Sequence, residues 1–170
     1  MYVSKRKLLQ DSPVTTSGEI TASKTIVLLD ELLTHTLPLR DLYKSARCRA
    51  VHFRQLRALF DTHYREQLAL VDVLVDRIRM LGGASRVLAG AFLQGTPPSY
   101  ALRGFWAPNR LLCELLDAHE FVMNVVYSAS TFSLQTDRSA VRDFAVGHVL
   151  LTNDQQSSFV REQLARLRAG

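Results

Sequence analysis

Apolar residues recur every three or four positions along most of this chain, which is the spacing of one face of an α-helix. Four long helices are predicted from this pattern, and no stretch alternates as a strand would. The predicted helices run from Thr21 or Ser23 to about Cys48, from the Arg49–Phe53 connection to Gly82–Gly83, from Pro108 to about Phe132, and from Thr136 to Arg168. The expected fold class is therefore all-α.

The connections between these helices indicate how they pack. Residues 49–53 are too few for anything but a hairpin, so the first two helices should be antiparallel neighbours. Pro38 lies inside the first helix and should kink or break it. Residues 84–107 form a long connection that starts with a short helical stretch, SRVLAGAFL, and continues with a Gly- and Pro-containing loop. The expected architecture is a four-helix bundle with a short helix in the crossover.

Three acids, Asp61, Asp72 and Asp76, border the apolar stripe of the second helix. Asp61 and Asp72 point within ~20° of each other but stand ~16 Å apart along the axis, too far to hold one metal ion within one chain. They can act together only if a second copy of the helix runs antiparallel, which would create two equivalent sites. The alternative is three solvated acids on an amphipathic helix.

The motifs of this helix resemble those of Dps proteins, the small ferritin-like proteins of starved bacteria. The resemblance rests on Asp61, on Asp72-Val-Leu-Val-Asp76-Arg77, on Leu81-Gly82-Gly83 and on the later run Cys113–Asp117, and it spans roughly residues 25–165. It implies a ferritin-like bundle, with the crossover helix packed at a subunit two-fold. It also implies a homo-oligomeric shell of twelve subunits. Such a shell oxidises ferrous iron as a ferroxidase, binds and stores the iron, and protects DNA under stress.

A Dps-like metal site would lie between subunits, with two histidines and an acid from one chain and two acids from its partner. The acids match Asp61 on one side and Asp72 and Asp76 on the other, but the histidines have no match. Their positions correspond to Arg57 on the second helix and to Ser45 or Arg47 on the first.

Arginine cannot ligate iron because it stays protonated and has no lone pair to give. Arg57 stands one turn before Asp61 and can bridge to it, or to the acids of a partner, so that its charge would substitute for the metal; the alternative is that Arg57 points to solvent. Iron is thus a possible ligand, and ferroxidase activity is predicted to be weak or lost. His52 precedes the helix and His63 points away from the acids, so neither is a good replacement ligand.

Other candidate sites are weaker. No Glu-x-x-His occurs, which excludes the ordinary di-iron site of a bundle core. His119 and His148 lie on or near apolar faces, as hydrogen-bonded core or surface residues do. The acids of the third helix could line an ion pore at a symmetry axis, as acids do in the family, or could be solvated charges. These acids are Glu114, Asp117 and Glu120.

Composition adds a basic arm to this picture. The 170 residues make one domain, with 47% apolar residues and a net charge of +5. Residues 1–20 show no hydrophobic period and are expected to form a flexible arm before a bundle domain of residues 21–170. Lys5, Arg6 and Lys7 in this arm could contact DNA phosphates without sequence preference. No signal peptide or membrane-length apolar run occurs, so a cytoplasmic protein without a membrane partner is predicted.

Three functions remain open from the sequence. The first is an iron-storing, stress-protective shell with a degenerate ferroxidase site. The second is a non-catalytic structural or DNA-binding shell protein. The third is a helical interaction module without an iron role, which need not form a large shell.

Overall fold

The computed structural model describes residues 17–50, 52–94, 107–132 and 140–169. Its elements are α1 (Ser17–Arg49), α2 (Arg54–Met80), α3 (Arg86–Gln94), α4 (Pro108–Phe132) and α5 (Ala140–Ala169). The predicted all-α class is confirmed, and no strand occurs in these ranges. The predicted start of the last helix at Thr136 and the end of the crossover lie outside the described residues.

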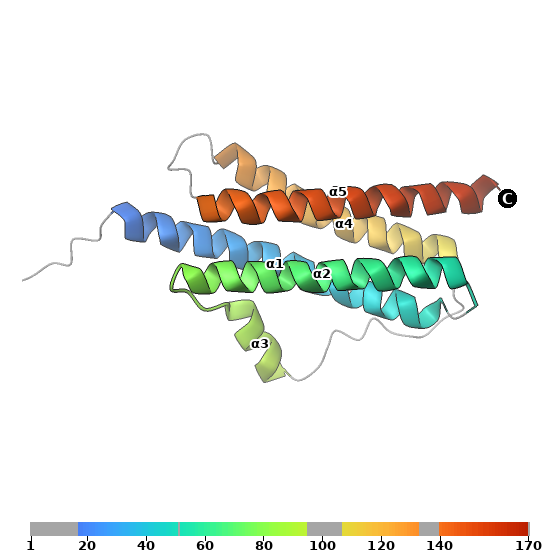
Figure 1. The fold of residues 1–170 in the computed structure, drawn as a ribbon, viewed down its shortest axis with the longest axis horizontal. Coiled ribbons are helices and arrows are strands. Elements are labelled where there is room, and N and C mark those ends of the chain that lie inside the picture. The colour runs from blue at the N-terminus through green and yellow to red at the C-terminus, as the bar shows by residue number, and fades with distance from the viewer. Residues whose placement is uncertain (1–16, 51, 95–106, 133–139, 170) are drawn as a thin grey trace, which may run out of the picture.

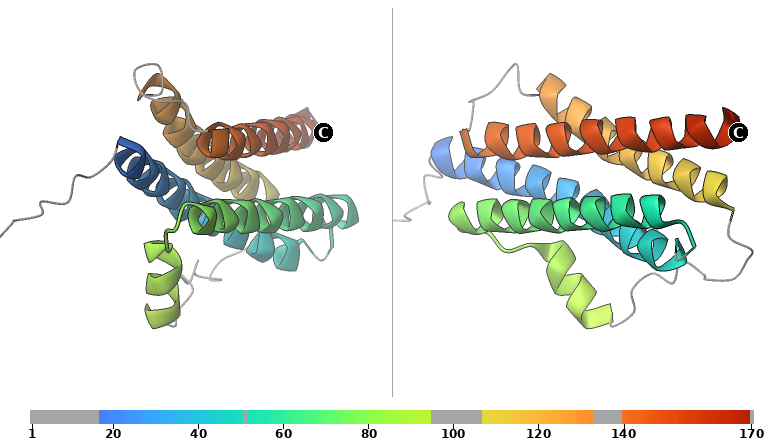
Figure 2. Two further views of the ribbon diagram at one scale, coloured as in Figure 1. Left: turned by 60° about the vertical axis from the view of Figure 1, so that its left-hand side comes forward. Right: turned by 45° about the vertical axis from the view of Figure 1, so that its right-hand side comes forward.

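The four long helices form one bundle, with α1 against α2 and α4, and α5 against α4 and α2 (Figure 1). Because α4 starts at the end of the bundle where α2 also starts, α2 and α4 run in the same direction (Figure 1). The short helix α3 projects from the bundle on the side of α1 and α2 (Figure 2) and contacts α1. The predicted four-helix bundle with a crossover helix is therefore confirmed.

Leucines supply most of the core, as the helical period predicts. Leu29, Leu32 and Leu33 of α1, together with Phe60 and Leu74 of α2, are completely buried. Burying one such side chain contributes roughly 1.5–3 kcal/mol. The core lies between the four long helices, so polar residues on their outer faces remain available for other contacts.

The first helix differs from its prediction in two respects. It begins at Ser17, earlier than the predicted Thr21 or Ser23, and so takes in the last four residues assigned to the arm. It also continues through Pro38, so the helix is not broken there. Leu33 and Leu39, which flank Pro38, are both completely buried. Packing of both halves into one core compensates for the hydrogen bond that proline cannot make.

The glycine pair after α2 lets the chain turn sharply toward α3. Gly82 has a φ of +75°, a conformation that side chains with a Cβ rarely adopt. Gly83 packs so closely on α1 that a Cβ there would lie 2.9 Å from Ile26 Cδ1. Nearby, the buried carboxylate of Asp30 accepts hydrogen bonds from Ser85 Oγ at 2.7 Å and Arg86 Nε at 3.4 Å. These contacts fix the start of α3 against α1.

Candidate ion-pair site at the end of the first hairpin

Asp61 is held by arginines on both of its carboxylate oxygens. Arg47 Nη1 donates a hydrogen bond to Oδ1 at 2.6 Å, and Arg65 Nη2 lies 2.7 Å from Oδ2. The Asp61 side chain is only 26% exposed, whereas that of Arg65 is 75% exposed. The pair to Arg47 therefore belongs to the packed hairpin, and Arg65 closes the carboxylate off on its solvent side.

The hairpin itself brings Arg47 and Asp61 together. Arg47 stands in the last turn of α1, Asp61 lies two turns into α2, and the short connection between the helices returns the chain at once. The guanidinium of Arg47 also lies over the ring of Tyr64, 5.2 Å from its centroid, which is a cation–π contact. Contacts on two sides thus hold Arg47 in one orientation.

The arginines change the acidity of this site. The hydrogen bond from Arg47 holds the pKa of Asp61 below its ordinary value, against partial burial, and the charges of Arg65, Arg47 and Arg57 act in the same direction. The same hydrogen bond raises the pKa of Arg47. Asp61 is therefore an ionised carboxylate whose negative charge is already matched by protein cations.

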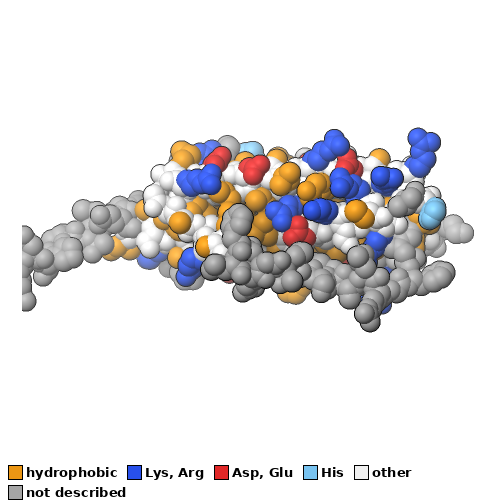
Figure 3. All heavy atoms as spheres, turned by 90° about the horizontal axis from the view of Figure 1, so that it is seen from below, with side chains coloured by type: hydrophobic (Ala, Val, Ile, Leu, Met, Phe, Trp, Pro, Cys, Tyr) orange, Lys and Arg blue, Asp and Glu red, His pale blue; other side chains and the backbone are white. Residues whose placement is uncertain are grey.

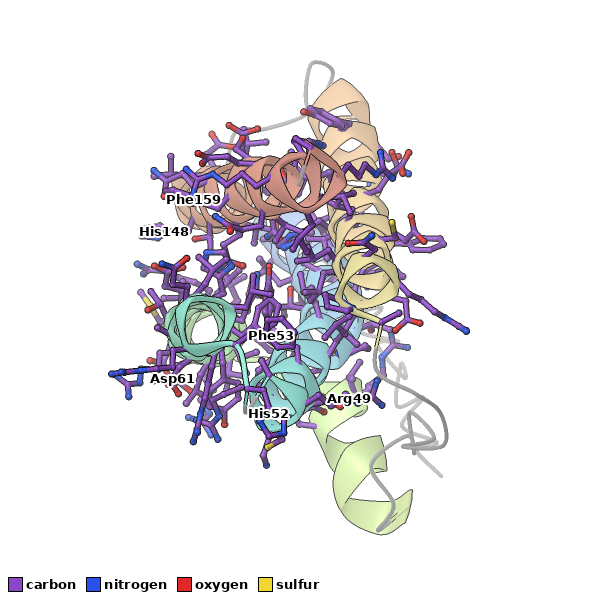
Figure 4. The ribbon with its side chains drawn as sticks, turned by 90° about the vertical axis from the view of Figure 1, so that its right-hand side faces the viewer. Arg49, His52, Phe53, Asp61, His148 and Phe159 are labelled. Carbon is purple, nitrogen blue, oxygen red and sulfur yellow. The ribbon has the colours of Figure 1, made fainter. Side chains whose placement is uncertain are left out.

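A hollow of about 470 Å³ opens beside this pair. It is lined by Arg47, Cys48, Arg54, Arg57, Ala58 and Asp61, so three arginines face a single acid. Figure 3 shows the molecule from below, where Lys and Arg side chains gather among apolar atoms. Figure 4 shows Asp61 on the side of α2 that faces away from α5, outside the bundle core. The site is thus on an outer face, available to another molecule.

Arg57 does not make the bridge considered from the sequence. Its side chain is exposed and lines the hollow, and among the described residues the ion pairs of Asp61 go to Arg47 and Arg65. Arg57 acts on Asp61 only through its charge. Of the two candidate positions on the first helix, Ser45 or Arg47, it is Arg47 that reaches Asp61.

The other two acids of α2 stand apart from this cluster. Asp72 is exposed, and Asp76, whose side chain is 70% exposed, lies 3.6 Å from Arg79 one turn later. Within the described part of the chain, no group of three or more His, Cys, Asp or Glu side chains is placed to hold a metal ion. One chain therefore brings Asp61 together with arginines, and not with the other acids.

The remaining predicted site residues are spread over the surface. Glu114 of α4 pairs with Arg110 at 3.1 Å, and Asp117 and Glu120 on the same helix are exposed. The cations of the arm, Lys5, Arg6 and Lys7, lie outside the described residues. None of the described helices is long and apolar enough to cross a membrane.

Sequence reasoning missed a buried polar network in the bundle centre. Tyr43 Oη lies 2.6 Å from His119 Nε2 and 3.1 Å from His63 Nδ1, and all three side chains are at most 2% exposed. His119 Nδ1 in turn lies 2.9 Å from Asn153 Oδ1. His119 is thus a hydrogen-bonded core residue, as its apolar face indicated, and His63 points into the bundle, away from the acids.

Two glutamines extend this network between α2 and α5. Gln67 Nε2 donates to Gln156 Oε1 at 2.8 Å, and Gln156 Nε2 donates to Glu66 Oε2 at 2.7 Å. Among the described residues, Gln67 Oε1 is the one buried side-chain nitrogen or oxygen atom without a hydrogen-bond partner. The available sequence signal was the helical spacing of His63 and Gln67, polar residues on the buried face of α2.

Burial determines the charge of the two histidines. It lowers the pKa of both from 6.5 to about 4. For His63 the charge of His119 adds to this effect. For His119 the hydrogen bond that its ring donates to Asn153 opposes the effect of burial, while the charge of Arg161 supports it. Burial also raises the pKa of Tyr43, helped by the charge of Glu66. At neutral pH the network is uncharged at its centre.

The fold and its sequence define a class of protein. Residues 26–169 match the ferritin-like domain family, so the chain belongs to that family. DpsC from Streptomyces coelicolor is 32% identical, with a TM-score of 0.71 over 85% of this chain and 86% of DpsC. Within the ferritin-like proteins, the chain is therefore of the Dps type.

More distant structures share the fold. Dps from Thermosynechococcus elongatus is 17% identical, with a TM-score of 0.71 over 88% of this chain and 95% of that protein. A dodecameric thioferritin, the bacterioferritin-related protein of Bacteroides fragilis, is 13% identical, with a TM-score of 0.71 over 87% and 88% of the two chains. An uncharacterized protein encoded in the bpoA2 5′ region of Kitasatospora aureofaciens is 37% identical over 109 residues, which are 61% of this chain and 70% of that protein.

Proposed function

We propose that this chain is the subunit of a homo-oligomeric, Dps-type shell that binds and stores iron but oxidises it weakly or not at all at the inter-subunit site. The observation that carries this proposal is the engagement of both oxygens of Asp61 by Arg47 and Arg65. The ferritin-like family and the likeness to DpsC support the shell and the iron role. A cytoplasmic location goes with this function.

The chemistry of the donor set explains the weak oxidation. A ferrous ion is bound by neutral imidazole nitrogens and by carboxylate oxygens with free lone pairs. Here Arg47 is protonated, and it already uses the carboxylate oxygen nearest to it. An iron ion would have to displace two guanidinium groups and would lie next to their charges. If the inter-subunit site at Asp61 does not oxidise iron, the shell stores ferric ions that form away from this site.

A second copy of the chain can complete the site with its own acids. The hollow beside Asp61 presents the guanidinium groups of Arg54 and Arg57, and α2 also carries the exposed Asp72 and Asp76. In an antiparallel two-fold contact, Asp72 and Asp76 of the second copy would meet these arginines. Arginine would then supply, from within the protein, the positive charge that a metal ion supplies in a Dps-like site between subunits. Arg57 remains the residue proposed to make this contact.

Ferrous-iron oxidation by the full-length protein tests the proposal. The wild-type shell should oxidise ferrous iron little faster than buffer does, followed by the absorbance of the ferric product. Replacing Arg47 and Arg57 together, by Arg47→His and Arg57→His, should increase the rate, because Oδ1 of Asp61 is released and two imidazoles are supplied. Arg79→His is the matched control, since it lies on the same helix and pairs with Asp76 instead. Rapid stoichiometric oxidation by the wild-type protein would refute the proposed loss of function.

DNA protection is the companion role, supported by the net charge of +5 and the three cations of the arm. Phosphate contacts by such cations carry no sequence information, so binding would be nonspecific and salt-dependent. A shell multiplies the arms and raises avidity without new contacts. The acids Glu114, Asp117 and Glu120 are proposed to guide cations at a symmetry axis of the same shell.

A further inference from the structure

The buried phenol of Tyr43 occupies an unusual position in this bundle. It is completely buried, and its oxygen lies between two imidazole rings, one from α2 and one from α4. The rings stand edge-on to the phenol, with centroids 5.1 Å away for His63 and 5.7 Å away for His119. A Phe at this position would fill the same apolar space, so packing alone does not require the hydroxyl group.

The neighbouring hydrogen bonds determine which atom carries each proton. Asn153 Nδ2 donates to the carbonyl oxygen of Val149 at 2.8 Å, which turns Asn153 Oδ1 toward His119 as an acceptor. His119 therefore carries its hydrogen on Nδ1, and Nε2 of the neutral ring is a bare lone pair. Tyr43 must then donate its hydroxyl proton to His119 Nε2 and accept a hydrogen bond from His63 Nδ1. The phenol is left with a short hydrogen bond to a free base.

This arrangement favours loss of an electron from the phenol. Removing an electron from a tyrosine without its proton produces a strongly acidic radical cation, which gives up its proton to a base within hydrogen-bond reach. A neutral imidazole already hydrogen-bonded to the hydroxyl group can take the proton in the same step. The product is a neutral tyrosyl radical, shielded from solvent by the four helices.

We propose that Tyr43 is a redox-active residue that donates one electron to a strong oxidant while its hydroxyl proton moves to Nε2 of His119. The oxidant is the hydroxyl radical, which forms when peroxide reacts with ferrous iron. The hydroxyl radical takes the electron from Tyr43 and leaves as hydroxide. Tyr43 becomes the neutral radical and His119 the imidazolium. A second ferrous ion can return the electron, after which the proton moves back to the phenol oxygen. The source of the oxidant rests on the proposed iron function, whereas the chemistry of Tyr43 does not.

His63 is a positioning residue in this scheme. Its Nδ1–H points at the phenol oxygen and would hydrogen-bond to the radical oxygen after the proton has left. Gln67, one helical turn away, has an unpartnered Oε1 in the same buried region. The same side chain donates through Nε2 to Asn153 Oδ1, which also accepts from His119, so Gln67 is linked to the ring that becomes charged on oxidation.

A light-driven oxidant tests Tyr43 without any iron. Flashes of a ruthenium tris-bipyridine photosensitiser, with an irreversible electron acceptor, would be applied to the intact protein, and the product would be followed by electron paramagnetic resonance. A long-lived tyrosyl signal is expected in the wild type, lost in Tyr43→Phe and retained in Tyr127→Phe, whose tyrosine is 57% exposed. His119→Phe should leave a smaller or short-lived signal. An unchanged signal in Tyr43→Phe would overturn the proposal.

A second measurement does not depend on how the variants fold. Wild-type protein grown with nitrogen-15-labelled histidine should show a histidine nitrogen coupled magnetically to the tyrosyl radical. A radical without such a coupling would place the electron loss on another tyrosine and overturn the proposal. Because iron is absent, a positive result stands even if the shell proves to store no iron. A negative result leaves the iron proposal intact.

Discussion

The two buried histidines should make the protein lose stability in mild acid, above the pH range in which carboxylates titrate. In the unfolded chain each imidazole takes up a proton as the pH falls through 6.5, whereas the folded protein delays this until about pH 4. Between these values the unfolded state binds more protons. The free energy of unfolding must therefore fall as the pH falls.

The pKa values give the size of this effect. A difference of one pKa unit corresponds to about 1.4 kcal/mol. Lowering the pH from about 6.5 to about 5 should therefore reduce the free energy of unfolding by about 2 kcal/mol per histidine. His63 and His119 share Tyr43 as a hydrogen-bond partner, so their titrations are coupled. About 4 kcal/mol is therefore the largest loss of unfolding free energy expected for the pair.

Urea unfolding followed by circular dichroism at about pH 7 and about pH 5 measures this loss. The protein concentration must be the same throughout, because the stability of an oligomer depends on it. The double variant His63→Gln/His119→Gln should be less stable at neutral pH but almost independent of pH in this interval. His52→Gln, which changes an exposed ring, should keep the wild-type dependence. If the double variant loses as much stability as the wild type, other groups cause the loss and the reasoning is refuted.

Four further outcomes are expected. Light scattering should give a large particle, about 230 kDa if twelve copies of the 19.1 kDa chain assemble, whereas a stable monomer or dimer would refute the shell. Arg57→Ala should weaken the two-fold contact more at neutral pH than in mild acid, measured as dissociation on dilution; an unchanged assembly would remove Arg57 from the contact. Deleting residues 1–12 should abolish gel retardation of DNA at low salt, and equal retardation by the truncated protein would exclude the arm. Gly83→Ala should cost about 1 kcal/mol by crowding Ile26, and Ile26→Val in the same chain should relieve part of it.

The long helices could be predicted because apolar residues recur at helical spacing in them, most clearly in α2 and α4, which also have recognisable boundary residues. Pro108 begins α4 and Gly82–Gly83 follows α2, as predicted. Pro38 was misleading because a local rule on proline does not include the packing of both halves of α1 into one core. The start of α1 at Ser17 was missed for a related reason, since its first turn lacks a strong apolar pattern.

The site was predicted less well than the fold because its contacts join different helices. Asp61 and Arg57 are neighbours in the sequence and suggested an ion pair, but the close partner is Arg47, fourteen residues away across the hairpin. Whether Ser45 or Arg47 would face Asp61 depended on the rotation of α1, which periodicity alone does not determine. The Tyr43 network was missed for the same reason, because its members come from α1, α2, α4 and α5.

The bond between Arg47 and Asp61 is made within one chain, and this sets it apart from a site that a metal must complete. It forms as soon as α1 and α2 pack, whatever the supply of divalent ions. The end of the hairpin should therefore have the same geometry in iron-starved and iron-replete cells. A chelator should leave its hydrogen exchange unchanged, and zinc or other competing ions should find no vacant carboxylate at Asp61 to occupy.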